Sequence, residues 1–73
     1  MKIIDRFEDV AAIKIANMTE EEYCDIVDNF VRKHEIMYYD LEGENTIICD
    51  RLEQEDYKKL YKFLKNYKKV IWN

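Results

Sequence analysis

The side chains best suited to nucleophilic chemistry are Cys24 and Cys49, which accompany a single histidine, His34. A catalytic thiol must lie within hydrogen-bonding reach of the imidazole that activates it. Cys24 and His34 are ten residues apart on one expected helix, which separates them by about 15 Å along its axis. Cys49 is expected to point into the core. We therefore interpret both cysteines as reduced thiols of a reducing compartment.

Other reactive motifs are missing from the sequence. There is no serine, and the single glycine, Gly43, cannot build a glycine-rich phosphate loop. One histidine and two isolated cysteines lack the paired spacing of a zinc site, and the acidic residues of the expected hairpin lack the spacing of a calcium loop. We expect neither a metal nor another cofactor.

Carboxylates are numerous enough that some must lie close together, and Asp40 and Asp50 are expected to be neighbours on one face of a hairpin. A general acid–base pair needs a cleft that shifts the pKa values of its members, and a small sheet offers little concavity. We interpret the pair as part of a solvated acidic patch, and we predict that the protein is not an enzyme.

The charges are distributed unevenly along the chain. Residues 1–56 contain all 16 acidic residues, whereas residues 57–73 contain six lysines and no acid. The net charge is −4. An acidic body repels a nucleic-acid backbone unless the basic segment forms a separate face.

The composition of the 73 residues is typical of a folded globular domain, with 48% hydrophobic and 14% aromatic residues. There is no proline, and no linker or repeat is visible. No apolar run approaches the ~20 residues of a membrane-spanning helix, and the N-terminus lacks a signal-peptide core. We expect one compact domain over residues 1–73, located in the cytoplasm and without membrane contact.

A helix is predicted to begin at Thr19. Thr19 and Glu22 have the spacing of a capping box, and Met18 and Tyr23 that of a hydrophobic staple. Apolar residues then recur at helical spacing. They are Tyr23, Ile26, Val27, Phe30 and Val31.

Residues 36–41 and 46–52 flank a turn-rich break and predict a β-hairpin, because they are rich in β-branched and aromatic side chains. Alternation predicts that one set of side chains faces the helices. That set is Met37, Tyr39, Leu41, Ile47 and Cys49. The other set is Ile36, Tyr38, Asp40, Thr46, Ile48 and Asp50.

A second helix is predicted from about Glu53 into the sixties, with apolar and lysine faces opposite each other. Residues 67–72 either continue this helix or leave at Asn66 to form a last strand. Near the N-terminus we favour a strand over residues 10–16, preceded by a second strand or an arm. A helical stripe from Ile3 to Lys14 is the alternative.

The expected order is β-α-β-β-α, with an optional extra strand at either end. It predicts an α+β fold in which a small, three- to four-stranded, mostly antiparallel sheet carries two amphipathic helices on one face. This is the split β-α-β layout, which by itself implies no function.

Three surfaces are candidates for binding. The outer face of the sheet combines apolar residues with a charged rim, as protein interfaces do, unless a terminal segment covers it. Its members are Val10, Lys14, Ile36, Tyr38, Asp40, Thr46, Ile48 and Asp50. The acidic stripe of the first helix contains Glu21, Glu22, Asp25 and Asp28. The lysine face of the second helix contains Lys58, Lys62, Lys65 and Lys69.

From these surfaces we predict a non-enzymatic, protein-binding module that acts stoichiometrically as a regulator or inhibitor of another protein. A small acidic inhibitor encoded by a phage or mobile element would have such properties, and the acidic stripe suits charge mimicry of nucleic acid against a nuclease or DNA-binding protein. The alternative is a nucleic-acid-binding module that uses the lysine face. Homodimerisation through sheet edges or outer faces is compatible with either hypothesis.

Overall fold

The computed structural model describes residues 1–5, 11–67 and 71–72, and this part of the chain contains five strands and two helical segments. The strands are β1 (Lys2–Asp5), β2 (Ile13–Ala16), β3 (Tyr39–Leu41), β4 (Thr46–Cys49) and β5 (Ile71–Trp72). The first helical segment begins as α1 (Glu20–Tyr23) and continues as η2 (Cys24–Val31), and the second is α2 (Gln54–Lys65).

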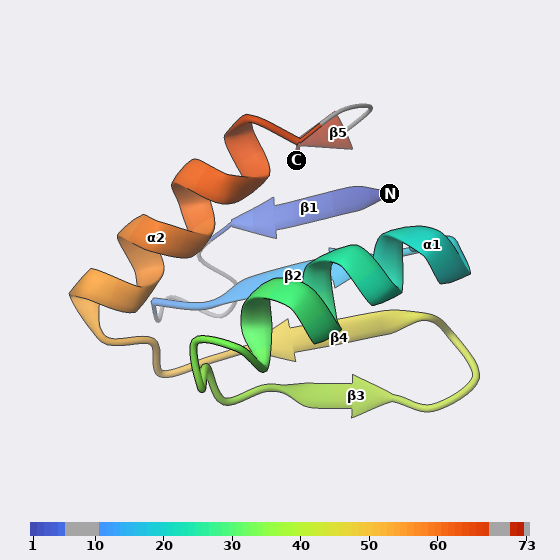
Figure 1. The fold of residues 1–73 in the computed structure, drawn as a ribbon, viewed down its shortest axis with the longest axis horizontal. Coiled ribbons are helices and arrows are strands. Elements are labelled where there is room, and N and C mark those ends of the chain that lie inside the picture. The colour runs from blue at the N-terminus through green and yellow to red at the C-terminus, as the bar shows by residue number, and fades with distance from the viewer. Residues whose placement is uncertain (6–10, 68–70, 73) are drawn as a thin grey trace.

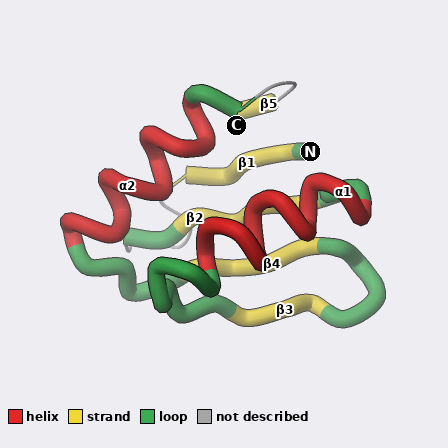
Figure 2. Tube along the Cα trace, in the orientation of Figure 1, coloured by secondary structure: helices red, strands yellow, loops and turns green. Residues whose placement is uncertain are grey.

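The strands form one sheet in the order β3-β4-β2-β1-β5. Three of its neighbouring pairs are antiparallel, and only β1 and β5 pair in parallel. Both helical segments lie over the same face of this sheet (Figure 1). Figure 2 shows the same layers, with the helices in red in front of the yellow strands. The predicted α+β fold is confirmed, and the optional extra strand is present at both ends of the chain.

The split β-α-β layout is also present. β2 and β3 run parallel to each other with β4 between them, because β4 is antiparallel to both. The helical connection between β2 and β3 therefore crosses over β4. The second helix connects β4 to β5, which lies beyond β2 and β1.

The core lies between the sheet and the two helical segments. Its fully buried side chains come from β1, β2, β4, η2 and α2. They are Ile3, Ile13, Ile15, Ile26, Val27, Val31, Ile47, Cys49, Leu60 and Leu64. Each side chain of this size contributes roughly 1.5–3 kcal/mol when it is removed from water, so this layer supplies most of the driving force for folding.

The predicted start of the first helix is confirmed. The backbone N–H of Glu22 donates to the Thr19 hydroxyl over 3.1 Å, and the Thr19 N–H donates to the Glu22 carboxylate over 2.8 Å. Beyond Tyr23 the helix widens into the π-helical segment η2, whose end is closed by a bond from Arg32 N–H to the Val27 carbonyl, five residues back. The sequence pattern predicts a helix here but not this wider winding.

The predicted facing of one hairpin strand is wrong. Ile47 and Cys49 of β4 are buried as expected, but Tyr39 pairs with Ile48, and Leu41 pairs with Thr46, on the outer face. The four-residue turn 42–45 places Leu41 opposite Thr46 and not opposite Ile47. Because side chains alternate between faces, this offset of one residue turns the whole of β3 over.

The second helix and the chain ends resolve the alternatives that the sequence left open. α2 ends at Lys65 with Asn66 as its C-cap, and β5 follows as a strand parallel to β1. Asn66 keeps a right-handed conformation (φ −95°, ψ 0°), so it does not act as the left-handed cap that asparagine favours. β1 and β2 are strands, which favours the strand interpretation of the N-terminal region over the helical stripe.

Replacing Thr19 with alanine removes the side-chain half of the capping box. We expect the free energy of unfolding to fall by about 1 kcal/mol, as measured by urea denaturation followed by circular dichroism. Thr19→Ser keeps the hydroxyl and should stay within about 0.5 kcal/mol of the wild type. Equal stability of the alanine and serine variants would show that the capping box does not stabilise the first helix.

Candidate functional site

A cleft of about 360 Å³ opens where the segment that precedes β3 faces the connection from β4 to α2. We call it the acidic cleft. Its lining consists of Glu35, Met37, Tyr38, Tyr39, Asp50, Arg51, Leu52, Glu53 and Asp56. It therefore joins two segments that are more than ten residues apart in the sequence.

The acidic cleft combines negative charge with exposed apolar surface. Four carboxylates line it and only one cation, Arg51. Met37 is 81% exposed and Tyr39 is 58% exposed, and they are the large hydrophobic side chains that stand out to solvent among the described residues. Methionine and tyrosine are enriched at the centres of protein interfaces.

The two walls of the cleft are anchored in the core. Ile36 and Leu52 are buried. The Ile36 N–H donates to the Val31 carbonyl over 2.9 Å, and the Leu52 N–H donates to the Ala11 carbonyl over the same distance. Both walls of the cleft are therefore fixed to the rest of the fold by a buried side chain and a backbone hydrogen bond.

Backbone strain is located in both walls. Glu35 has φ 57° and Arg51 has φ 50°, in the left-handed region that only glycine, asparagine and aspartate enter readily. Each such residue costs roughly 1–2 kcal/mol. Strained conformations of this kind gather at functional sites, where the surrounding structure holds them, and these two residues line the cleft together with the exposed Met37.

The cleft adjoins an open edge of the sheet. β3 pairs with β4 on one side, and on its other side no strand lies next to it among residues 1–5, 11–67 and 71–72. An unpaired edge presents free backbone donors and acceptors to an extended peptide. The cleft and the edge therefore form one continuous candidate site.

The residues of the predicted outer-face patch do not lie together in the structure. Ile36 is only 3% exposed, so its assignment to a binding surface is wrong. The chain carries Ile36 into the core at the end of the first helix, before the strand alternation begins at Tyr39. Tyr38 is half-buried and lines the acidic cleft together with Asp50. Ile48 is half-buried on the outer face beside Tyr39.

The other predicted members of that patch take different places. Thr46 is buried and donates to the Glu44 carbonyl. Lys14 pairs with Ile48 on the outer face, and Val10 lies outside the described residues. The described terminal strands β1 and β5 extend the sheet and do not cover this face.

Three tyrosine hydroxyls donate to aspartates and tie the layers together. Tyr23 donates to Asp40 of β3, Tyr57 donates to Asp5 of β1, and Tyr67 donates to Asp25 of η2 over 3.1 Å. Asp40 pairs with Ile47, so it lies on the helix face and not on the predicted outer face. Sequence reasoning missed these pairs because their partners are 17 to 52 residues apart.

The acidic stripe of the first helix is partly engaged within the fold. Asp25 accepts the Tyr67 bond, and Asp28 forms an ion pair of 3.4 Å with Arg32 one turn later. Glu22 belongs to the capping box, whereas Glu21 is exposed. The stripe therefore adds negative potential but few unengaged carboxylates.

The predicted lysine face is also divided. Lys58 lines a hollow beside Tyr57 and Asp5, and the Lys65 ammonium lies 5.5 Å from the centre of the Tyr61 ring. Lys62 lines a separate groove between the helices, together with Lys59, which was not among the predicted residues. Lys69 lies outside the described residues.

Neither cysteine is activated as a nucleophile. Burial and, to a smaller extent, the charge of Asp50 raise the pKa of Cys49 to about 12. Cys24 is exposed, and partial desolvation together with the nearby Asp28 and Asp25 raises its pKa. A reactive cysteine needs a lowered pKa, so both thiols stay protonated at neutral pH.

Comparison of the chain with known protein families, with curated proteins and with solved structures found no match. Within the described ranges, no helix is long and apolar enough to cross a membrane. Nor do the described histidine, cysteine, aspartate and glutamate residues include a group of three that could hold a metal ion. The surfaces of the molecule are thus the basis for inferring its function.

The bond between Tyr23 and Asp40 predicts a loss of stability at alkaline pH. This hydrogen bond, burial and the charge of Asp40 raise the pKa of Tyr23 from 10.0 to about 12. The folded state favours the protonated phenol. The contribution of this hydrogen bond to stability is therefore complete below pH 10 and is lost as the pH rises toward 12. Tyr23→Phe should lower the free energy of unfolding at pH 8 by about 1 kcal/mol. Above pH 10, the free energy of unfolding of this variant should fall less steeply with pH than that of the wild type.

Tyr39→Phe is the matched control, because the exposed Tyr39 side chain faces the opposite side of the sheet. Urea denaturation at pH 8 and pH 11 measures both variants. The account of the Tyr23 bond is contradicted if both variants show the same pH dependence as the wild type.

Proposed function

We propose that the protein is a non-enzymatic binding module that regulates or inhibits another protein stoichiometrically, by docking it at the acidic cleft and the β3 edge. One observation carries this proposal: the exposed Met37 and Tyr39 lie at a cleft with four carboxylates, beside the edge strand β3, whose outer side has no neighbouring strand among the described residues. Apolar anchors, charge and backbone hydrogen-bonding groups are thus available on one surface.

The chemistry of the site supports one kind of partner segment, which is extended and carries basic and apolar side chains. An extended segment could add a strand at the β3 edge and place its side chains alternately. Basic side chains of that segment would meet Asp50, Glu53 and Asp56, while an apolar side chain would pack against Met37. Opposite charges accelerate and orient such an encounter.

The short edge strand limits how much the backbone can contribute. β3 has only three residues, so strand addition supplies few hydrogen bonds. Most of the binding energy must come from a small number of buried anchors. Among the residues whose exposure is described, Met37 and Tyr39 are the side chains with enough exposed apolar area to serve in this way.

Inhibition by mimicry of nucleic-acid charge is a narrower form of the proposal. It would use Glu21, Asp25 and Asp28, but two of these three already have partners within the fold. Binding of nucleic acid through the lysines is the less favoured function, because the predicted lysines are divided between separate surfaces. The acidic cleft is the better-formed site.

The proposal is tested with a bait that carries Met37→Glu and Tyr39→Glu. Both substitutions place charge on side chains that are already exposed, so the fold should persist, as circular dichroism can verify. Wild-type bait should retain one host protein at one-to-one stoichiometry, measured by light scattering of the purified complex. The double variant should bind it at least about tenfold more weakly, as expected for the loss of hot-spot contacts.

Lys58→Glu is the control, because it changes the net charge by the same two units at an exposed site outside the cleft. It should retain the same host protein as the wild type. Equal retention by the double variant, or sustained turnover of a substrate by the isolated chain, would overturn the proposal. Recovery of a second copy of the chain alone would show that the edge serves self-association.

A further inference from the structure

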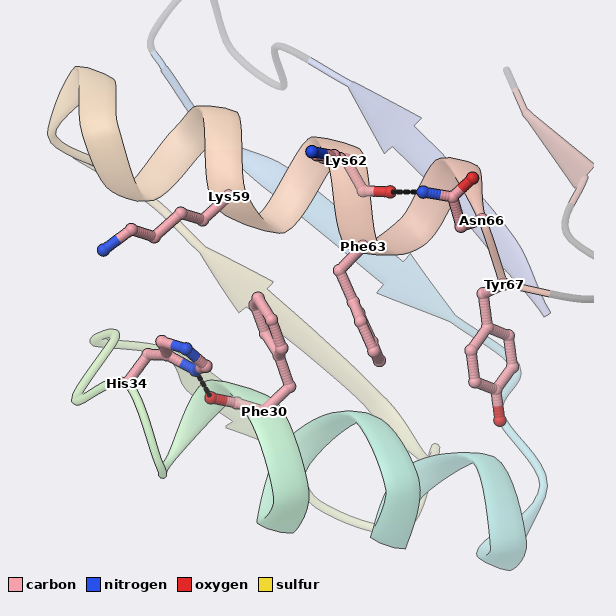
Figure 3. A pocket seen from close by; sticks show the side chains of 7 residues that line it. All are labelled: Phe30, His34, Lys59, Lys62, Phe63, Asn66 and Tyr67. Atoms are coloured by element: carbon pink, nitrogen blue, oxygen red, sulfur yellow. Dashed lines mark hydrogen bonds between the residues drawn. The ribbon is translucent and has the colours of Figure 1, made fainter.

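A second hollow, separate from the acidic cleft, lies between the two helical segments. We call it the aromatic groove (Figure 3); its volume is about 530 Å³. It is lined by Phe30, His34, Lys59, Lys62, Phe63, Asn66 and Tyr67. Its size is that of a site for a small molecule.

The floor of the groove is a row of aromatic rings. Phe30 and Phe63 stack across the helix interface with their ring centres 4.2 Å apart and their planes within 12° of parallel. His34 continues the row at 4.3 Å from Phe30, and Tyr67 lies 5.9 Å from Phe63. Both phenylalanines are only half-buried, so part of their apolar surface is open to solvent.

The two ends of the groove differ in charge. Figure 3 shows Lys59 and His34 at one end and Tyr67 at the other. At the Tyr67 end, Asp25 accepts the tyrosine bond, and burial, this bond and the charges of Glu22 and Glu21 raise the pKa of Tyr67. Among the described residues that line the groove are two lysines, Lys59 and Lys62, and no carboxylate, in a protein with net charge −4.

The two lysines are accessible to an anion. Lys62 is exposed and forms no ion pair with a described residue. Lys59 pairs with Glu55 over 3.4 Å, but both side chains are at least half exposed. Surface pairs of this kind contribute about 0–1 kcal/mol, so a ligand can displace Glu55 at little cost.

We propose that the aromatic groove binds a small amphipathic anion, with its carboxylate, sulfonate or phosphate at Lys59 and Lys62 and its apolar ring or short chain along Phe30 and Phe63. The difference in charge between the two ends of the groove sets the orientation of the ligand, because the acidic end at Tyr67 repels the anionic group of the ligand. The same polarity opposes an extended nucleic acid, whose phosphates would have to pass Asp25 and Glu22. In addition, Phe30 and Phe63 stack on each other, so one face of each ring is already covered and unavailable to a nucleic-acid base.

The probe is 8-anilinonaphthalene-1-sulfonate, a sulfonate attached to an aromatic body. We expect saturable one-to-one binding by fluorescence and calorimetry, with amide shift changes in nuclear magnetic resonance spectra centred on Phe30, His34 and Phe63. Lys62→Glu should weaken binding about tenfold, as expected for loss of a charge-assisted contact. N-phenyl-1-naphthylamine, which has the same body without the sulfonate, should bind more weakly by a similar factor.

Lys58→Glu is the matched control, since it carries the same charge change on the same helix but lies outside this groove. It should leave the affinity for the probe within about twofold of the wild type. The proposal is overturned by equal weakening in the two variants, by absence of saturable binding at millimolar probe, or by shift changes located elsewhere. Tighter binding of a single-stranded oligothymidylate than of the probe would also overturn it and would indicate a nucleic-acid site.

Discussion

The handedness of two crossover connections determines where the candidate surfaces of this protein lie. The connection from β2 to β3 and the connection from β4 to β5 start from strands of opposite direction and move toward opposite edges of the sheet. Two crossovers of one hand then place both helices over the same face, as observed (Figure 1). The core forms on that face, the groove forms between the helices, and β3 is left at an open edge.

Much of this fold was predictable from local sequence signals. Thr19 and Glu22 define the start of the first helix, and two β-branched segments around a polar turn define the hairpin. The facing of β3 was not predictable in the same way, because it depends on a turn of four residues whose offset the alternation pattern does not reveal. The three tyrosine–aspartate bonds were missed for a related reason: they join segments that only the completed fold brings together.

The sequence predicted the chemical character of the candidate site but not its geometry. The excess of acid and the involvement of Tyr38 and Asp50 follow from the sequence, but the cleft also needs Glu35 and Arg51 in left-handed conformations. Met37 was expected to face the core, and it is instead the most exposed large apolar side chain described. Ile36 is buried in the core where Met37 was expected. This exchange, caused by the late start of β3 at Tyr39, moves the proposed binding surface from the open sheet face to the edge.

The central claim is that recognition occurs at the β3 edge and the acidic cleft. Hydrogen–deuterium exchange of the chain, alone and saturated with the protein it retains, measures this directly. Amides of residues 37–41 and 50–53 should exchange at least about tenfold more slowly in the complex, because a docked strand accepts hydrogen bonds from these amides and shields them from water. Slower exchange confined to the first helix or to the outer sheet face, with no change at residues 37–41, would contradict the account.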